Sequence, residues 1–346
     1  MPDLPKKMAS GAGLSIGGVT VGAPVALAPM SGITDAPFRR LVARFGAGWV
    51  VSEMVPSDDL ARGEEEARLR AEGDGLDLHV VQIAGCEPRW MAEGAKVAAG
   101  AGAGIIDINM GCPAKRVTGG YAGSALMRDL DLAEALIAAT VAAVDIPVTL
   151  KMRLGWDEAS INAPELARRA EALGVGLITV HGRTRQQFYK GSADWRAIAA
   201  VRGATGLPLV ANGDVTTLAD AANCLEQSGA DAVMIGRGAQ GRPWFPAQVA
   251  AHLAGQPVPD DPDLDRQRQI AVALYEEQLG HYGVAVGVRH ARKHLGWALD
   301  QAAGTAGVAP AELAQARQRV LTLDQPAAVI GALTEAYDLF AWRAAA

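Results

Sequence analysis

Residues 105–109 read Ile-Ile-Asp-Ile-Asn, and an alanine-rich stretch, Leu130–Val144, follows after a loop that contains several glycines. A short β-branched run that ends in polar residues and leads into a helical run is typical of a βα unit with a parallel strand. The pattern recurs and predicts eight strands: Val25–Ala28, Trp49–Ser52, Leu78–Ile83, Ile105–Asn109, Val148–Met152, Leu177–Val180, Leu209–Asn212 and Ala232–Ile235.

Between these runs lie segments of helix formers that end near glycine, as crossover helices do. They are Glu87–Gly100, Leu130–Val144, Pro164–Leu173 and Thr217–Ser228. Repeated βα units over about 250 residues are what a (β/α)8 barrel requires. We therefore predict an α/β fold of the TIM-barrel type, with a small hairpin at Leu14–Val21 that covers the bottom of the barrel.

A second, all-helical domain is expected after the barrel. Residues 255–265 contain three prolines and four aspartates, the composition of a linker. Helical periodicity follows in Gln267–Gly280, Val286–Asp300, Pro310–Leu321 and Pro326–Arg343. We predict a barrel domain over 1–254, a linker over 255–265 and a smaller helical domain over 266–346.

Charge and cysteine content limit the classes of partner. The net charge is −6, so any contact with nucleic acid must be regional. Three cysteines are too few and too scattered for a disulfide framework or a zinc cluster, which favours the cytoplasm and no metal. The uncharged stretch Leu14–Thr34 is broken by glycines and prolines, so no membrane span is expected, and a monomer is the default.

Polar residues close the predicted strands, where TIM-barrel enzymes carry their catalytic groups. They are Ser52-Glu53, Gln82, Asn109, Lys151, His181, Asn212 and Arg237. The loops after the seventh and eighth strands bind phosphate in many barrels, and here they contain Asn212-Gly213-Asp214 and Gly236-Arg237. Neither a Gly-x-Gly-x-x-Gly turn after the first strand nor a Walker phosphate loop is present, which argues against a Rossmann fold.

Several motifs together resemble those of the tRNA-dihydrouridine synthases, and the similarity extends over nearly the whole chain. The motifs are Ala28-Pro29-Met30-Ser31-Gly32-Ile33-Thr34-Asp35, Asp107-Ile108-Asn109-Met110-Gly111-Cys112-Pro113, Lys151-Met152-Arg153, His181-Gly182-Arg183-Thr184-Arg185 and Ala211-Asn212-Gly213-Asp214-Val215. Cys112–Val117, Gly123–Leu126 and Arg292–Trp297 are most similar to the bacterial DusB branch, whereas Thr118–Tyr121 departs from its pattern.

The resemblance implies that the enzyme reduces uridine to 5,6-dihydrouridine in the D-loop of tRNA, with NADPH regenerating the reduced FMN. Hydride delivered from flavin N5 to C6 of the uracil leaves an enolate that needs a proton at C5. A thiol is mostly protonated at neutral pH and can act as the acid. Cys112 stands in the family's acid position, between Gly111 and Pro113, and is the predicted catalytic residue.

FMN is the implied cofactor. Gln82 and Lys151 are expected at the flavin ring, where a lysine would stabilise the anionic reduced form. The full set of expected cofactor contacts is Ala28, Pro29, Met30, Gln82, Lys151, His181, Asn212, Gly213, Asp214, Gly236 and Arg237.

The substrate implied is tRNA, with the target nucleotide drawn out of its stack into the barrel mouth and the helical domain gripping the neighbouring backbone. The resemblance places Asn109 near both flavin and uracil, and its amide can donate to and accept from a pyrimidine edge. The basic residues expected to face RNA are Arg183, Arg185, Lys115, Arg116, Arg289, Arg292 and Lys293, although such clusters are often only solvated surface.

Two alternatives stay open at this point. One is an FMN barrel that acts on a free pyrimidine, such as dihydroorotate dehydrogenase, which would need no RNA-binding tail. The other is a non-catalytic RNA-binding protein on a retained barrel, which would bind no flavin.

Overall fold

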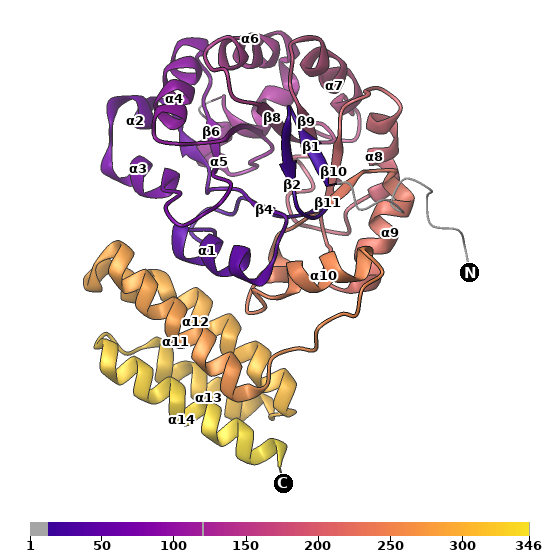
Figure 1. The fold of residues 1–346 in the computed structure, drawn as a ribbon. Helices are drawn as coiled ribbons and strands as arrows, with labels where there is room; N and C mark the ends of the chain where they lie inside the picture. The colour runs from indigo at the N-terminus through magenta and orange to yellow at the C-terminus, as the bar shows by residue number, and fades with distance from the viewer. Residues whose placement is uncertain (1–12, 120, 346) are drawn as a thin grey trace. The chain divides into compact units, whose positions relative to one another are not determined.

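The computed structural model describes residues 13–119 and 121–345, with the Arg116 side chain left out. It confirms the predicted α/β barrel: parallel strands form a ring with helices around it (Figure 1). The barrel strands are β3 (Val25–Leu27), β4 (Trp49–Val50), β6 (Val80–Ala84), β7 (Ile105–Met110), β8 (Val148–Arg153), β9 (Leu177–His181), β10 (Leu209–Asn212) and β11 (Ala232–Ile235).

The ring closes through a short contact beside β4. β11 pairs with β3, and β3 pairs with β4, all in parallel. Val51 then forms a parallel bridge to Val80, and the Ser52 amide donates to the Val80 carbonyl at 3.0 Å. A two-residue strand, β5 (Val55–Pro56), extends the pairing along β6.

Helices cover the outside of the barrel, as the alanine-rich segments predicted. Their bounds are α1 (Ala36–Phe45), α2 (Ser57–Arg62), α3 (Glu65–Ala71), α4 (Pro88–Gly100), α5 (Lys115–Thr118), α6 (Leu130–Val141), α7 (Ala163–Ala172), α8 (Trp195–Arg202), α9 (Leu218–Ser228) and α10 (Phe245–Leu253), with 3-10 turns η1 (Gly123–Arg128) and η2 (Arg237–Ala239). Local sequence sets the ends: Thr217 and Asp220 form a capping box that begins α9, and Gly229 ends it in the left-handed conformation.

The predicted N-terminal hairpin is present and packs where it was expected. β1 (Leu14–Ile16) and β2 (Val19–Val21) pair in antiparallel fashion around Gly17-Gly18, and both glycines have positive φ. Ile16 and Val21 are buried against Trp49, Ile105, Leu177 and other residues near the N-terminal ends of the barrel strands. In Figure 1 the hairpin lies across the middle of the ring. It covers that end of the barrel.

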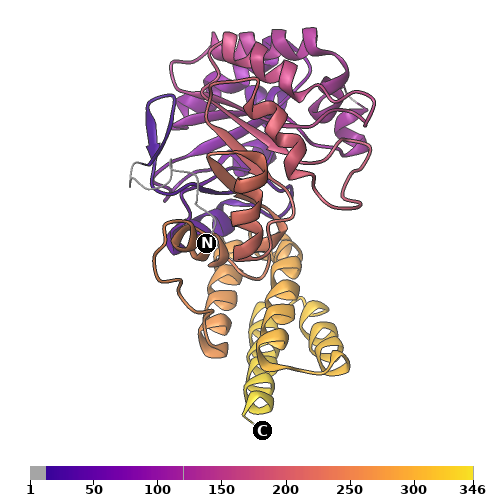
Figure 2. The ribbon, with the colours of Figure 1, turned by 90° about the vertical axis from the view of Figure 1, so that its right-hand side faces the viewer.

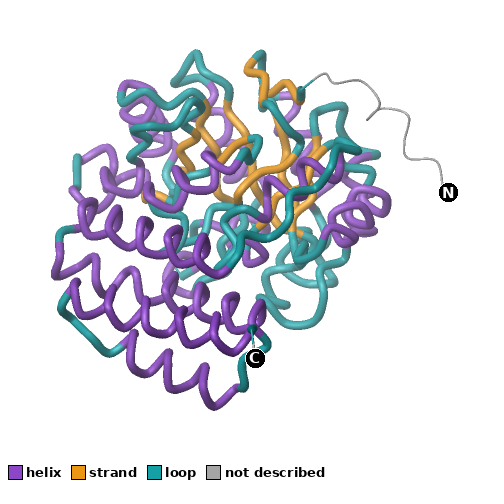
Figure 3. The backbone as a smooth tube through the Cα atoms, turned by 60° about the horizontal axis from the view of Figure 1, so that its bottom comes forward, coloured by secondary structure: helices purple, strands orange, loops and turns teal. Residues whose placement is uncertain are grey.

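The chain divides into two compact units, Met1–Gly238 with Pro246–Pro257, and Ala239–Phe245 with Val258–Ala346. The second unit contains α11 (Leu264–Tyr282), α12 (Val284–Ala306), α13 (Pro310–Leu321) and α14 (Pro326–Ala344). These helices pack side by side around buried residues such as Leu299, Leu333 and Phe340 (Figures 2 and 3). A helical C-terminal region was expected, but the grouping of residues 239–245 with it was not.

Candidate functional site

Strand register brings the predicted polar residues together at the C-terminal end of the barrel. Asn109 on β7 lies opposite Lys151 on β8, and His181 on β9 lies opposite Asn212 on β10. Neighbouring parallel strands end on the same edge, so these four side chains form one group. This edge is the one on which TIM barrels carry their chemistry.

The loop that carries Cys112 is held from both sides. The Asn109 Oδ1 atom accepts from the amide nitrogens of Gly111 at 3.2 Å and Cys112 at 3.0 Å. Ser124 donates to the Cys112 carbonyl through its amide at 3.1 Å and its hydroxyl at 2.8 Å. The half-buried Cys112 side chain therefore projects from a backbone that hydrogen bonds hold on both sides.

A buried chain of hydrogen bonds supports Asn109 from below. Asp107 accepts from Thr149 Oγ1 and from Gln82 Nε2, each at 2.6 Å, and Gln82 Oε1 accepts from Asn109 Nδ2 at 2.7 Å. Burial raises the pKa of Asp107. A carboxylate oxygen only accepts, so Gln82 must present its oxygen to Asn109, and Asn109 must present its own oxygen to the Cys112 loop. The chain thus sets the orientation of two amides.

Arg153 belongs to the Lys151-Met152-Arg153 motif, but it was not among the predicted site residues. Its Nε donates to the Gly111 carbonyl at 2.7 Å, and its Nη1 donates to the carbonyls of Thr184 and Phe188 at 3.0 Å each. Burial lowers its pKa to about 10, so it stays charged at neutral pH. Arg153 joins the cysteine loop to the loop after β9. Its spacing of two residues from Lys151 on one strand is the signal that places both on the same face.

Lys151 is a buried cation near the centre of the group. Its Nζ donates to Asn212 Oδ1 at 3.0 Å, and Asn212 is oriented by its own Nδ2, which donates to the Met234 carbonyl at 2.8 Å. Burial, assisted by the charge of Arg153, lowers the pKa of Lys151 to about 8. The side chain is therefore mostly protonated at pH 7, and an ammonium has three hydrogens to donate.

His181 is held as a neutral imidazole. Burial and the nearby charges of Arg153 and Lys151 lower its pKa well below the ordinary value. Arg183 Nη1 lies 3.3 Å from His181 Nε2. Because a guanidinium can only donate, Nε2 is the acceptor and the proton sits on Nδ1.

In the predicted phosphate loops, Asp214 is an anion held by two arginines and a backbone amide. Asp214 receives hydrogen bonds from Arg183 Nη1 at 3.1 Å, from Arg237 Nη2 at 3.0 Å and from the Ala193 amide at 2.8 Å. Burial opposes the charge on Asp214, but the Arg183 and Ala193 hydrogen bonds outweigh it and lower the pKa. Arg237 is thus oriented by Asp214 while about half of its side chain, 55%, stays exposed.

Two glycines lie at this edge, and at Gly213 the backbone is approached closely. Gly213 has φ +123°, and a Cβ on it would lie 2.7 Å from the Cβ of Ala193. Gly236 faces the first strand, because a Cβ placed on it would lie 3.8 Å from the Ala28 Cβ and 3.6 Å from the Met30 sulfur. Gly213 therefore lies beside His181, and Gly236 lies beside Ala28 and Met30.

Glu53 closes β4 on the same edge. Its carboxylate accepts a hydrogen bond from the Gly32 amide, and burial raises its pKa. Arg39, also buried, donates to the carbonyls of Thr34 at 3.1 Å and Glu72 at 2.6 Å. Both side chains brace the loop after β3, which contains Pro29 and Met30.

The structure separates the basic residues that were expected to face RNA. Arg183 is 1% exposed and bonded to Asp214 and to loop carbonyls, so it does not take the RNA-facing position that we expected. Arg185 lies over the Trp156 ring at 5.0 Å, and Lys115 is exposed. The Arg116 side chain lies outside the described residues.

In the helical unit, Arg289 and Lys293 are exposed one turn apart on α12. Arg292 on the same helix pairs with Asp324 at 2.7 Å. Arg289 and Lys293 are therefore the tail cations on the exposed face of α12, while Arg292 is engaged within its own unit.

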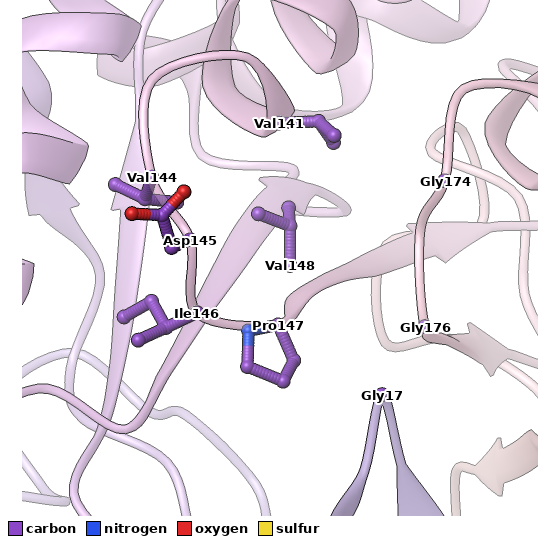
Figure 4. Close-up of a pocket in the computed structure, with 9 residues that line it drawn as sticks. All are labelled: Gly17, Val141, Val144, Asp145, Ile146, Pro147, Val148, Gly174 and Gly176. Atoms are coloured by element: carbon purple, nitrogen blue, oxygen red, sulfur yellow. The ribbon is translucent and has the colours of Figure 1, made fainter.

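A pocket at the other end of the barrel is separate from this site. It is lined by Gly17, Val141, Val144, Asp145, Ile146, Pro147, Val148, Gly174 and Gly176 (Figure 4). Its lining residues are glycine, valine, isoleucine and proline, with Asp145 as the charged residue. Across 13–119 and 121–345 there is no cluster of three or more His, Cys, Asp or Glu side chains placed to hold a metal, and no helix is long and apolar enough to cross a membrane.

Comparison with known proteins decides the family. The profile described as Dihydrouridine synthase (Dus) matches residues 26–329. The chain belongs to the dihydrouridine synthase family. As a member, it is an enzyme, and the resemblance seen in its motifs is confirmed.

Curated relatives of this synthase match along most of their length. A probable tRNA-dihydrouridine synthase of Rhizobium leguminosarum bv. phaseoli is 58% identical over 314 residues, covering 91% of this chain and 95% of the relative. One from Rhodobacter capsulatus is 53% identical and covers 94% and 98%. The tRNA-dihydrouridine synthase B of Xanthomonas campestris pv. campestris is 48% identical over 82% of this chain and 86% of its own length.

Solved structures support the synthase fold alone. Histamine dehydrogenase from Rhizobium sp. 4-9 matches with a TM-score of 0.54 at 14% identity, over 76% of this chain and 50% of that one. A 2-naphthoyl-CoA reductase matches with a TM-score of 0.54 at 14% identity, over 70% and 52%. Both matches agree with the barrel described above.

Proposed function

We propose that the chain is a tRNA-dihydrouridine synthase that reduces the 5,6 double bond of a D-loop uridine, with Cys112 donating the proton to C5. The observation that carries this is the fixed Cys112 loop at the edge where Asn109, Lys151, His181 and Asn212 converge. Relatives named probable tRNA-dihydrouridine synthase support tRNA as the substrate.

The residues of the barrel mouth fit FMN as the cofactor. Lys151 is a buried ammonium with Asn212 as its hydrogen-bond acceptor, and a carbonyl-rich flavin ring would accept its other hydrogens. Gly213, Gly236 and Arg237 would hold the phosphate, with Arg237 oriented by Asp214. When bound and reduced, FMN would supply hydride from N5 to C6 of the uracil, with NADPH as the reductant that restores it.

The protein's own residues place the proton. The thiol of Cys112 is directed by backbone bonds on both sides, and these do not involve the side chain that reacts. Asn109 carries a second hydrogen on Nδ2 that can reach a uracil carbonyl while the first stays on Gln82. Lys151, mostly charged at neutral pH, favours negative charge on a neighbouring ring.

RNA would be bound by the exposed cations. From the predicted site residues these are Lys115 and Arg237 in the barrel unit, together with the half-buried Arg185, and Arg289 and Lys293 in the helical unit. Arg183 would act indirectly, by holding Asp214 in place. The boundaries 1–254, 255–265 and 266–346 stay our proposal for a catalytic barrel, a linker and a tRNA-binding domain.

The decisive experiment compares Cys112→Ala with Cys86→Ala. General acids contribute on the order of 100-fold to 10,000-fold, so dihydrouridine formation in unmodified tRNA should fall by at least about 100-fold in Cys112→Ala. Its flavin absorbance should stay at the wild-type level. Cys86 is half-buried as well and follows β6, but it has no part in the hydrogen bonds described for the Cys112 loop, so Cys86→Ala should keep its activity.

Each alternative predicts a different result. Full activity of Cys112→Ala would refute the acid assignment. Reduction of free pyrimidines without tRNA would favour an enzyme of the dihydroorotate dehydrogenase type. Purified protein that takes up no flavin would favour a non-catalytic RNA-binding protein.

A further inference from the structure

Three non-glycine residues of the described chain have a left-handed backbone. They are Tyr121 at φ 59°, Phe188 at φ 55° and Asp214 at φ 53°. All three lie in loops that follow β7, β9 or β10, at the edge that carries Cys112. Side chains other than those of Gly, Asn and Asp rarely adopt this conformation, and strained residues gather at functional sites.

The backbone at Phe188 is held in this conformation by other groups. The Phe188 amide donates to the Arg185 carbonyl at 3.1 Å, and Arg153 donates to the Phe188 carbonyl at 3.0 Å. Gln187 Oε1 accepts from the Thr184 amide at 2.8 Å, which closes the same turn. None of these contacts uses the phenyl ring, so Gly or Asn would form the turn at lower cost. The ring itself must therefore serve another purpose.

The ring is exposed beside a second aromatic residue. Phe188 is 40% exposed and Tyr189 is 49% exposed. Their ring centroids are 4.7 Å apart, edge to face. The guanidinium carbons of Arg153 and Arg237 lie 5.7 and 5.5 Å from the centre of the Tyr189 ring. Exposed aromatic faces among cations are the combination that binds unpaired nucleotides, through stacking and through phosphate contacts.

We propose that Phe188 stacks on a nucleobase adjacent to the target nucleotide when RNA is bound. The inference rests on the proposed function and extends it to a specific contact. Drawing one nucleotide out of a stack exposes the faces of the two bases beside it. A phenyl ring at the rim of the barrel mouth covers one of those faces and compensates for the lost stacking.

The first test measures binding of an unmodified tRNA transcript to four proteins: wild type, Phe188→Asn, Phe188→Gly and Phe188→Tyr. Asn and Gly fit the left-handed turn but lack a ring, whereas Tyr keeps the ring. Stacking by one aromatic side chain corresponds to roughly a tenfold change in affinity. We expect the Asn and Gly variants to lose about that factor, with melting temperatures equal to or above that of the wild type, and Tyr to bind as the wild type does.

The second test locates the base. Once the modified uridine is mapped, transcripts with an abasic site on its 5′ or its 3′ side are bound to the wild type and to Phe188→Asn. On one of the two, the difference between the proteins should disappear, because the partner of the ring is absent.

The proposal is overturned if the ring-free variants bind intact tRNA as tightly as the wild type. It is also overturned if Phe188→Asn binds both abasic transcripts more weakly than the wild type does, by the same factor as for intact tRNA. Neither outcome bears on the proposed function, which stands as long as the wild type forms dihydrouridine in a separate activity assay. A wild type that forms none would instead refute the proposed function.

Discussion

Changing Asn109 to Asp would test whether the buried hydrogen-bond chain has a fixed direction. Asp107 accepts from Gln82 at 2.6 Å, and Gln82 accepts from Asn109 at 2.7 Å. With a carboxylate at both ends, the single NH2 group of Gln82 can serve only one of them. Two oxygens must then face each other, whichever way the Gln82 amide is turned.

The size of the effect follows from burial. All three side chains are buried, and an unsatisfied buried polar group costs about 1–3 kcal/mol, or more when charged. We take about 3 kcal/mol for Asn109→Asp, which corresponds to a drop in melting temperature of roughly 6–12 °C for a folding unit of about 250 residues such as the barrel unit. Asp107→Asn should cost only about 1 kcal/mol, since its new NH2 group can donate to the Thr149 hydroxyl.

The double variant Asp107→Asn with Asn109→Asp should recover most of the loss. Gln82 can turn over, accept from Asn at 107 and donate to Asp at 109, and the new carboxylate still accepts from the Cys112 amide. We expect a loss of about 1 kcal/mol rather than the additive value of about 4 kcal/mol.

Urea unfolding of the four proteins, followed by circular dichroism, measures this coupling as a double-mutant cycle. The loss of unfolding free energy in Asn109→Asp should also become smaller as the pH falls. Burial near Asp107 raises the pKa of the added carboxyl, so its stability contribution is present at low pH and lost as the pH rises through that pKa. A double variant as unstable as the sum of the single variants would show that the chain has no fixed direction.

Two further predictions concern pH. The pKa of Lys151 is about 8 in the folded protein against 10.5 ordinarily, so the folded state binds fewer protons and stability rises between those values. Lys151→Met should lack this rise. Urea unfolding at pH 7.5 and 10.5 should show the difference in free energy of unfolding between variant and wild type changing by about 3 kcal/mol. An equal difference at both pH values would contradict the prediction. The pKa of Asp214 is lowered, so its stabilising effect is present above the ordinary carboxyl range and lost as the pH falls. The advantage in melting temperature of wild type over Asp214→Asn at pH 6 should therefore shrink below pH 4, and a constant difference would contradict the ion pair.

The barrel could be predicted because its determinants are local. Strands such as Leu209–Asn212 are buried on both faces, so they are continuous apolar runs, and parallel pairing places their polar ends on one edge. The same logic places Lys151 and Asn212 on one edge of the barrel, although it does not predict the hydrogen bond between them. Helix ends were also readable from Thr217 and Gly229, because caps act within one turn.

The contacts of individual polar side chains could not be predicted, because they depend on loops that are far apart in the sequence. Arg183 looked like a surface cation, but Asp214, 31 residues away, and the carbonyls of its own loop bury it. Gln82 was expected to face the flavin, yet its amide is bonded to Asp107 and Asn109 on the next strand. Arg153 was overlooked because its partners are backbone carbonyls, which leave no trace in the side-chain sequence.

The hairpin under the barrel has a kinetic consequence. With Ile16 and Val21 filling the lower end, whatever reaches Lys151 must enter and leave by the upper one. With the proposed function, a nicotinamide and a uracil would have to bind through the same opening. They would bind one after the other, and the flavin would hold the reducing equivalents between the two binding events.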